Sequence, residues 1–243
     1  MNAESAGYRD AESAGYRDAE SAGYRGGGPI AVLDYGAGNL TSVENALRHL
    51  GARFRTTSDP AELADADGVI FPGVGEAAAS MAVLRKTGLG AGLRSFLASG
   101  RKVLGICIGC QVIFDRSEER STTCLGLVPG MVRRFPPGTG LKVPHMGWNA
   151  MHFTRQHPVF AGIPQDTRFY FVHSYYPDPV DRELVAAETE YGLVFPACIA
   201  RGNLVAFQCH VEKSGSFGLK LLSNFLSWDG KWAETPPPAA AHA

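Results

Sequence analysis

The sequence predicts an α/β fold with a mixed, mostly parallel central sheet that is flanked by helices. Three short apolar runs, at 29–34, 68–71 and 102–106, each end in a glycine-containing turn. Short apolar runs bounded by turn residues are typical of buried parallel strands. Segments with helical spacing of apolar residues follow these turns, and repeated strand, turn and helix builds a sheet with helices on both faces. Because such sheets carry their chemistry at the carboxyl ends of the strands, we expect the functional residues in these turns.

The predicted elements follow one another regularly through the first half of the chain. A glycine turn at 35–39 follows the first apolar run, and the segment 41–50 then has the apolar spacing of a helix. The segment 81–97 predicts one helix or two, interrupted by glycines. A further helix is predicted to begin within 111–115.

The second half predicts shorter strands with tight connections, at 168–173, 193–200 and 204–209. These strands make the sheet mixed rather than purely parallel. An amphipathic helix at 216–226 closes the domain, with four apolar side chains facing inward. They are Leu219, Leu222, Phe225 and Leu226.

Both ends of the chain have low complexity. Residues 3–25 contain three copies of a polar repeat that begins AESAGYR, and the chain ends in TPPPAAAHA. Three short polar copies cannot bury a core. We therefore predict a disordered repeat tail at 1–28, a folded domain at 29–229 and a loose tail at 230–243.

Composition excludes several classes of function. The formal net charge of −1 gives no field that would gather nucleic acid or an anionic membrane. No stretch approaches the roughly 20 apolar residues of a membrane span, and the N-terminus lacks the features of a secretory signal. The five cysteines are odd in number and scattered, which argues against a disulfide framework. We therefore expect a reducing, cytoplasmic compartment.

The sharpest motif is Gly-Ile-Cys-Ile-Gly at 105–109, after a predicted strand and before a helix. It has the form of a nucleophile elbow with Cys107 at its centre. The helix N-terminus favours a thiolate, and the N–H of Ile108 is placed to stabilise an oxyanion. Two alternatives stay open here: Cys107 as a small buried apolar residue, or Cys107 and Cys110 as a redox or metal pair. A zinc site would need a second ligand pair, which the sequence lacks.

A cysteine nucleophile needs a base, and His210 is the candidate. Glu212 lies two residues further on, and residues two apart in an extended segment point to the same side. A carboxylate that holds one imidazole nitrogen fixes the tautomer and stabilises the imidazolium. His210 alone could equally be an exposed histidine or one satisfied in the core. Its combination with the upstream cysteine elbow favours catalysis.

At these residues the sequence resembles the class I glutamine amidotransferases, and within them the glutaminase subunits of imidazole glycerol phosphate synthases. The elbow and the His-x-Glu pair occur across the superfamily, whereas PHMGWN at 144–149 and YFVHSYY at 170–176 are specific to this subunit. The resemblance runs from about Ile30 to Trp228. Further matching stretches are DYGAGN at 34–39, FPGVG at 71–75, RSEE at 116–119 and HVEKS at 210–214.

The resemblance implies a single flavodoxin-like domain with the class I glutamine amidotransferase fold, and it implies roles residue by residue. The catalytic triad would be Cys107, His210 and Glu212. The oxyanion strand would be Gly73, Val74 and Gly75, with the N–H of Val74 joining that of Ile108. The glutamine-binding residues would be Gly75, Gln111, His173, Ser174 and Tyr175. The face towards the synthase partner would carry Asn39, His145, Trp148, Asn149, Tyr170 and Lys213.

As the resemblance implies, the chain would hydrolyse glutamine to glutamate and ammonia through a cysteine thioester, with no metal or organic cofactor. The ammonia would pass to a separate (β/α)₈-barrel cyclase subunit, in a 1:1 heterodimer. That subunit would make imidazole glycerol phosphate and aminoimidazole carboxamide ribotide in histidine biosynthesis. The alternatives are a glutaminase for a pyridoxal phosphate or purine synthase, a partner-independent γ-glutamyl hydrolase or peptidase, and a non-enzymatic binding module.

The sequence departs from the family pattern near the site. Val211 stands where superfamily members often have proline, so the placement of Glu212 should depend on packing. Glu76 replaces a small residue after the oxyanion strand and leaves the loop packing open. Cys110 and Cys209 replace other apolar residues and are tolerable soft hydrophobes.

Overall fold

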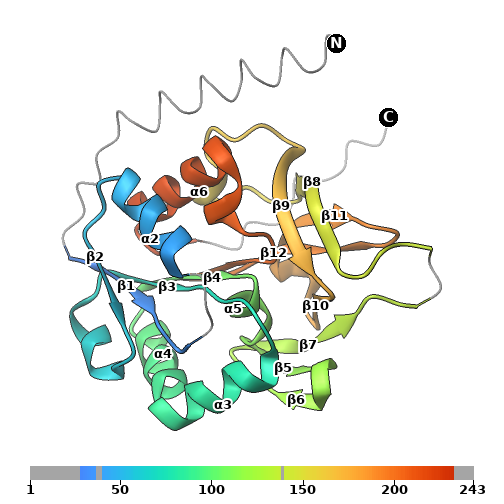
Figure 1. Ribbon diagram of the computed structural model, residues 1–243. Helices are drawn as coiled ribbons and strands as arrows, with labels where there is room; N and C mark the ends of the chain where they lie inside the picture. Colours follow the sequence, from blue (N-terminus) through green and yellow to red (C-terminus); the bar gives the residue numbers. More distant parts are fainter. Residues whose placement is uncertain (1–27, 37–39, 138–139, 233–243) are drawn as a thin grey trace.

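The structure, a computed structural model, describes residues 28–36, 40–137 and 140–232. Within them a nine-stranded sheet forms the centre of the molecule (Figure 1). Its strands are β1 (Ile30–Leu33), β2 (Phe54–Thr57), β3 (Gly68–Phe71), β4 (Lys102–Ile106), β8 (His145–Phe153), β9 (Thr167–His173), β11 (Val185–Glu190), β12 (Val194–Arg201) and β13 (Leu204–Phe207). The strand order is β2-β1-β3-β4-β13-β12-β11-β8-β9.

The first five strands in that order are mutually parallel, and the remaining pairs are antiparallel. Every residue of β1, β3, β4 and β13 is buried. This explains why these strands stand out in the sequence as continuous apolar runs, as strands covered on both faces do. A mixed central sheet is confirmed, with four parallel and four antiparallel strand pairs.

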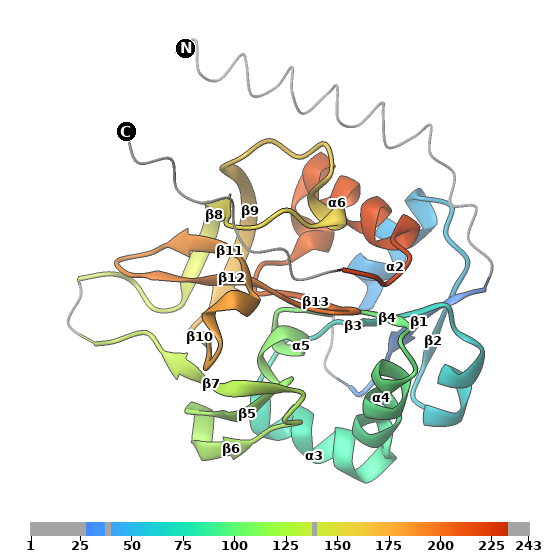
Figure 2. The same cartoon turned by 180° about the vertical axis from the view of Figure 1, so that it is seen from behind.

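Helices cover both faces of the parallel strands (Figures 1 and 2). On one side lie α2 (Leu40–His49) and α6 (Gly215–Ser227), and on the other lie α3 (Ala77–Thr87) and α4 (Leu89–Ala98). Each pair buries its apolar stripe in its own core cluster, so successive residues of a strand point into different cores. The short helix α5 (Ile108–Gln111) directly follows β4.

A second, four-stranded sheet was not predicted from the sequence. Its order is β10-β7-β5-β6, and it lies beside the main sheet, below β12 in Figure 2. Its strands are β5 (Phe114–Ser117), β6 (Thr122–Thr123), β7 (Val128–Arg134) and β10 (Tyr175–Pro179).

The predictions for the individual elements are largely confirmed, with two corrections. The helix predicted to begin within 111–115 is wrong, because α5 already ends at Gln111 and β5 begins at Phe114. There the carbonyls of Ile113 and Phe114 accept hydrogen bonds from the segment 126–128 instead of continuing a helix. In α6, Leu219 is only half-buried, and Leu221 is fully buried in its place, together with the predicted Leu222 and Phe225.

The two predicted tails lie almost wholly outside the described residues. Folded contacts continue slightly past the predicted boundary at 229, since Trp232 Nε1 donates to the carbonyl of Gln156 (2.9 Å). The longest described helix, α6, has 13 residues, and none in the described range has the length and apolar character that crossing a membrane requires.

Candidate active site

Cys107 occupies a strained turn between β4 and α5. Its φ of 53° and ψ of −105° are unusual for a residue with a side chain. The turn is held because Cys107 N–H donates to the carbonyl of Phe207 (2.8 Å). Glycine is required at position 109, since a Cβ there would lie 1.8 Å from the carbonyl oxygen of Phe71. The tight, strained elbow predicted from the sequence is confirmed.

His210 reaches the same end of the sheet from β13. Its backbone N–H donates to the carbonyl of Tyr170 (2.8 Å), and its Nδ1 lies 2.8 Å from Glu212 Oε1. Because an ionised carboxylate only accepts, Nδ1 carries the proton. The two side chains are 2% and 4% exposed. Val211, at the position where proline was missing, is fully buried, so its packing and the hydrogen bond from His210 hold Glu212 in place.

Cys107 and His210 line one cavity of about 260 Å³. This is smaller than the roughly 300–1,000 Å³ of pockets for drug-sized ligands, and suits a small metabolite. The other lining residues are Val74, Gly75, Ile108, Gln111, Glu119, Pro144, Val172, His173 and Ser174. The cavity therefore collects most of the predicted site from segments far apart in the chain.

The electrostatics of His210 favour an imidazolium. Burial acts to lower its pKa, but the Cys107 sulfur and the Glu212 carboxylate outweigh burial and raise the pKa to about 10. His210 Nε2 has no hydrogen-bond partner among the described residues, so its interaction with the sulfur is electrostatic rather than a well-aligned hydrogen bond. A protonated His210 beside Cys107 can hold a thiolate and later deliver a proton.

The backbone carbonyl of Tyr175 organises two further side chains of the cavity. It lies 3.0 Å from Gln111 Nε2 and 2.8 Å from His173 Nδ1. A carbonyl only accepts, so both nitrogens must carry hydrogens. Tyr175, which we expected to contact glutamine, does not line the cavity. It acts instead through Gln111 and His173, which do.

A second histidine lies behind His173. Burial lowers the pKa of His173 to about 3 and that of His145 to about 4, so both rings are neutral. Since His173 Nδ1 carries its hydrogen, its Nε2 accepts from His145 Nδ1 (2.9 Å). His145 Nε2 then accepts from Asn149 Nδ2 (3.3 Å).

The segment 73–75, which we predict to be the oxyanion strand, lies against Tyr35. The Tyr35 hydroxyl donates to the carbonyl of Pro72 (2.7 Å), and a Cβ at Gly73 would lie 1.9 Å from that hydroxyl oxygen. Val74 and Gly75 line the cavity, whereas Gly73 does not. Just beyond, Glu76 is paired with Arg120 Nε (2.7 Å), which shows how the loop accommodates this departure from the family pattern.

Two polar residues near the site were missed as functional candidates. Glu119 lines the cavity, and its Oε2 accepts from the N–H of Ala77 (2.7 Å) at the start of α3. Burial raises its pKa. Gln208 lies beside Cys107 without lining the cavity. The sequence contained a signal for each of them. Glu119 ends the RSEE stretch, and Gln208 is a polar residue directly after a buried strand.

The residues expected on the partner face do not form one surface. Trp148 and Tyr170 are cross-strand neighbours on β8 and β9, with ring centroids 6.1 Å apart. Trp148 is 47% exposed. His145 is only 3% exposed, so its placement on the surface was wrong. Its ring stacks between those of Phe171 and Tyr191, at 5.1 and 4.0 Å.

Asn149, Lys213 and Asn39 are the other three residues predicted for the partner face. Asn149 lies with His145 on the opposite side of β8 from Trp148, because side chains alternate along a strand. Lys213 is half-buried in the short turn that follows His210. Asn39 lies outside the described residues.

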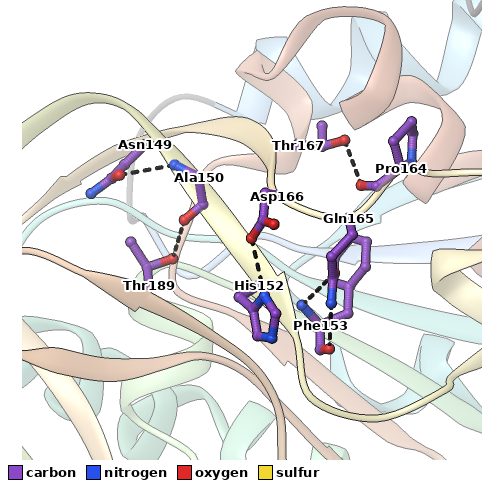
Figure 3. A network of polar contacts seen from close by, with 9 residues as sticks. All are labelled: Asn149, Ala150, His152, Phe153, Pro164, Gln165, Asp166, Thr167 and Thr189. Carbon is purple, nitrogen blue, oxygen red and sulfur yellow. Dashed lines mark hydrogen bonds and ion pairs between the residues drawn. The ribbon is translucent and has the colours of Figure 1, made fainter.

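A larger hollow of about 790 Å³ lies between β8 and β11. The two strands pair only at Phe153 with Ala187 and His152 with Glu188, and Thr189 Oγ1 adds a hydrogen bond to the carbonyl of Ala150 (3.0 Å). Figure 3 shows this part of β8. The hollow is lined in part by the exposed side chains of Met146, Trp148 and Val194.

The loop before β9 is hydrogen-bonded to the C-terminal end of β8. His152 Nδ1 lies 3.0 Å from Asp166 Oδ1, and the Gln165 amide both accepts from the N–H of Phe153 (2.8 Å) and donates to its carbonyl (2.9 Å) (Figure 3). The hollow contains no cysteine, and the described residues include no group of three or more His, Cys, Asp or Glu arranged to hold a metal ion. Its size does not make it the reaction site.

A cysteine on a strained elbow and a His–Glu pair that meet at the carboxyl edge of a parallel sheet define a class of thiol-dependent transferases and hydrolases. The sequence model of the family described as "Glutamine amidotransferase class-I" matches residues 31–228. The chain belongs to this family.

Two relatives within this family are about half identical to the chain. The chain is 49% identical to the "Imidazole glycerol phosphate synthase subunit HisH" of Dehalococcoides mccartyi (strain CBDB1), over 81% of this chain and 96% of that protein. It is 51% identical to the protein of the same name from Moorella thermoacetica, over 81% of this chain and 93% of that protein.

Solved structures agree on the fold. A chain described as "Structure of PurLQS from Thermotoga maritima" superposes with a TM-score of 0.65 at 18% identity, covering 83% of this chain and 99% of that one. A chain described as "Crystal structure of glutamine amidotransferase" also gives a TM-score of 0.65, at 19% identity, covering 82% of this chain and 99% of that one. At this identity the likeness shows the class I amidotransferase fold alone.

Proposed function

We propose that this chain is the glutaminase subunit of an imidazole glycerol phosphate synthase and acts in histidine biosynthesis. One observation carries the chemistry: Cys107, on its strained turn, and the His210–Glu212 pair meet in a single small cavity. The pathway is supported by the identity of about half of the residues to two HisH subunits. These relatives favour the histidine pathway over a pyridoxal phosphate or purine synthase.

In the first half of the reaction, the Cys107 thiolate attacks the side-chain carboxamide carbon of glutamine. The N–H groups of Ile108 and Val74 stabilise the charge that develops on the oxygen. His210 gives the proton on Nε2 to the departing nitrogen, ammonia leaves, and a γ-glutamyl thioester remains on Cys107. The Glu212 carboxylate stabilises the imidazolium throughout and holds its ring in place.

In the second half, His210 is neutral and takes a proton from water, which attacks the thioester carbon. The tetrahedral intermediate collapses, glutamate leaves and the thiolate–imidazolium pair is restored. Gly75, Gln111, His173 and Ser174 would hold the amino-acid end of glutamine. Every bond and proton in this cycle is handled by the substrate, water and groups of this chain, so the proposal requires no metal or organic cofactor.

A partner follows from the fate of ammonia, which water near neutral pH converts into unreactive ammonium. We propose a separate (β/α)₈-barrel cyclase subunit that receives the ammonia directly, in a 1:1 heterodimer in the cytoplasm. The exposed Met146 and Trp148 (63% and 47%) and the adjoining Tyr170 offer it an apolar surface. Five free cysteines fit a reducing compartment.

The decisive experiment mixes the purified chain with the cyclase subunit, its ribotide substrate and glutamine, and follows glutamate and both cyclase products. We expect one glutamate to be released for each turnover of the cyclase. Glutamine hydrolysis should be faster with the partner and its ligand than without them. Ammonium salts should support the cyclase reaction without this chain. Release of glutamate from γ-glutamyl peptides, with equal rates in the absence of the partner, would favour a hydrolase and overturn the proposal.

A further inference from the structure

Gln208 is a buried amide beside Cys107 that the proposed reaction cycle does not use. It directly follows β13, and its side chain is 0% exposed. Its backbone N–H donates to the carbonyl of Ala197 (2.9 Å), which fixes the direction of the side chain. A buried amide is costly unless it is hydrogen-bonded, so its contacts indicate what it does.

The carbonyl of Tyr175 determines how the Gln208 amide is turned. Because that carbonyl accepts from Gln111, the Gln111 atom facing it must be Nε2. The same nitrogen lies 2.9 Å from Gln208, so the facing atom of Gln208 must accept and is Oε1. The remaining atom, Gln208 Nε2, lies 3.9 Å from Cys107 Sγ and donates towards it. The orientation of both amides therefore follows from one backbone group.

Two consequences follow for the cavity. Both hydrogens of Gln111 Nε2 are used by Tyr175 and Gln208, so Gln111 Oε1 is the polar atom that remains for a ligand. Gln111 lines the cavity, and an amide oxygen there can accept from an ammonium group but not from a carboxylate. At its other end, Gln208 supplies an N–H to the reacting sulfur. One residue thus contacts both the ligand-binding amide and the nucleophile.

We propose that Gln208 is a positioning residue of the glutaminase reaction. It holds Gln111 with its oxygen facing the α-ammonium group of glutamine, and it steadies the Cys107 sulfur by an N–H···S contact. The inference rests on the proposed function, because it assigns the two contacts to glutamine binding and to thiolate attack. It also separates the two tasks, since Oε1 of Gln208 serves binding and Nε2 serves the sulfur.

Two substitutions test these tasks separately. Gln208→Met keeps a similar volume and removes both contacts. Gln208→Glu keeps an oxygen acceptor for Gln111 and removes the amide N–H towards the sulfur. The matched control is Asn203→Leu, at the other end of β13, where Asn203 Nδ2 donates to the carbonyls of Leu97 and Arg101 (2.9 and 2.6 Å). This control also loses a structural amide, but far from the cavity.

The measurements are kcat and KM for glutamine in the complete complex, together with thermal unfolding. For Gln208→Met, KM should rise about tenfold or more, because a buried donor of Gln111 loses its acceptor, and kcat should fall as well. For Gln208→Glu, KM should return to within about threefold of the unmodified chain, while kcat stays low. Asn203→Leu should lower the unfolding temperature and leave both kinetic constants unchanged.

The outcomes distinguish this inference from the proposed function. If the unmodified complex does not hydrolyse glutamine, the proposed function fails. If it does, two results overturn the inference and make Gln208 a structural core amide. In the first, Gln208→Met keeps unmodified kinetics and only lowers the unfolding temperature, as Asn203→Leu does. In the second, both Gln208 variants raise KM and lower kcat to the same extent. Recovery of KM in Gln208→Glu without recovery of kcat supports it.

Discussion

The parallel and antiparallel halves of the nine-stranded sheet contribute different parts of the site. The parallel strands β4 and β13 end just before Cys107 and His210, and every residue in both strands is buried. The antiparallel β8 and β9 instead alternate buried and open positions. They supply His173 to the cavity and expose Met146 and Trp148.

This difference follows from the packing of the two halves. Strands covered by helices on both faces cannot shift without disrupting two cores, so they hold the reacting atoms in fixed positions. Strands with one uncovered face leave apolar side chains available, and exposed apolar patches mark interaction sites. We infer that the parallel half performs the chemistry, whereas the antiparallel half connects it to substrate and partner. The predictions below test that division.

The largest effect is expected in the parallel half, at the nucleophile. Cys107→Ala should reduce glutamine hydrolysis to background, since no other group can form the thioester. The matched variant is Cys110→Ala, three residues on, where the thiol is fully buried, outside the cavity, and has a pKa that burial raises well above its usual value. It should keep glutaminase activity. Glutamate release is the measurement, with circular dichroism to verify folding; activity in Cys107→Ala would break the assignment.

The next largest effect concerns the carboxylate that supports His210. Glu212→Gln keeps the shape but removes the charge that helps to raise the pKa of His210. We expect kcat to fall about a hundredfold, in line with the loss of a general acid–base contribution. The alkaline limb of the pH–rate profile should also move to lower pH. A profile that kept its position would show that Glu212 does not act through His210.

A smaller effect is expected in the antiparallel half. Trp148→Ala should lower partner-stimulated hydrolysis about tenfold, as loss of an aromatic interface anchor does, and leave hydrolysis without the partner unchanged. Because the side chain is 47% exposed, the free energy of unfolding should change by less than about 1 kcal/mol. Titration of the partner, monitored by glutamate release, separates these effects. An equal loss with and without the partner would contradict the division between the two halves.

The smallest effect is the alkaline loss of activity in the unmodified chain. The folded-state pKa of His210 is raised from 6.5 to about 10. The stability contributed by its protonated form is therefore fully present below pH 6.5 and is lost as the pH rises through about 10. We expect kcat/KM and the unfolding temperature to decline together near pH 10. A decline of kcat/KM near pH 6.5 would mean that the imidazolium is not stabilised.

Much of the fold could be predicted from the sequence where burial is complete. The boundaries of β3 and β4 match the apolar runs at 68–71 and 102–106, because strands covered on both faces need continuous apolar residues. The strand β8 was missed. Its glycine, tryptophan and asparagine at 147–149 do not form an apolar run, and its pairing with β9 and β11 makes it a strand.

The residues of the site also divide into those that the sequence could predict and those that it could not. Cys107, His210 and Glu212 could be located because their spacing carries the chemistry. The burial of His145 could not be predicted, since it depends on rings from other strands that stack on it. Gln208 was missed for a similar reason. Its role appears only when the carbonyl of Tyr175, distant in sequence, fixes the orientation of Gln111.

The most direct test of the account is to trap the covalent intermediate. The chain and its cyclase partner are mixed with glutamine, quenched in acid within one turnover, digested and analysed by mass spectrometry. We predict a γ-glutamyl group on the peptide that contains Cys107, and fragmentation should assign it to Cys107 rather than Cys110. The amount of this adduct should be larger when His210 is replaced by Asn, because hydrolysis of the thioester slows. Turnover of glutamine with no adduct on Cys107, or with an adduct on another cysteine, would contradict the account.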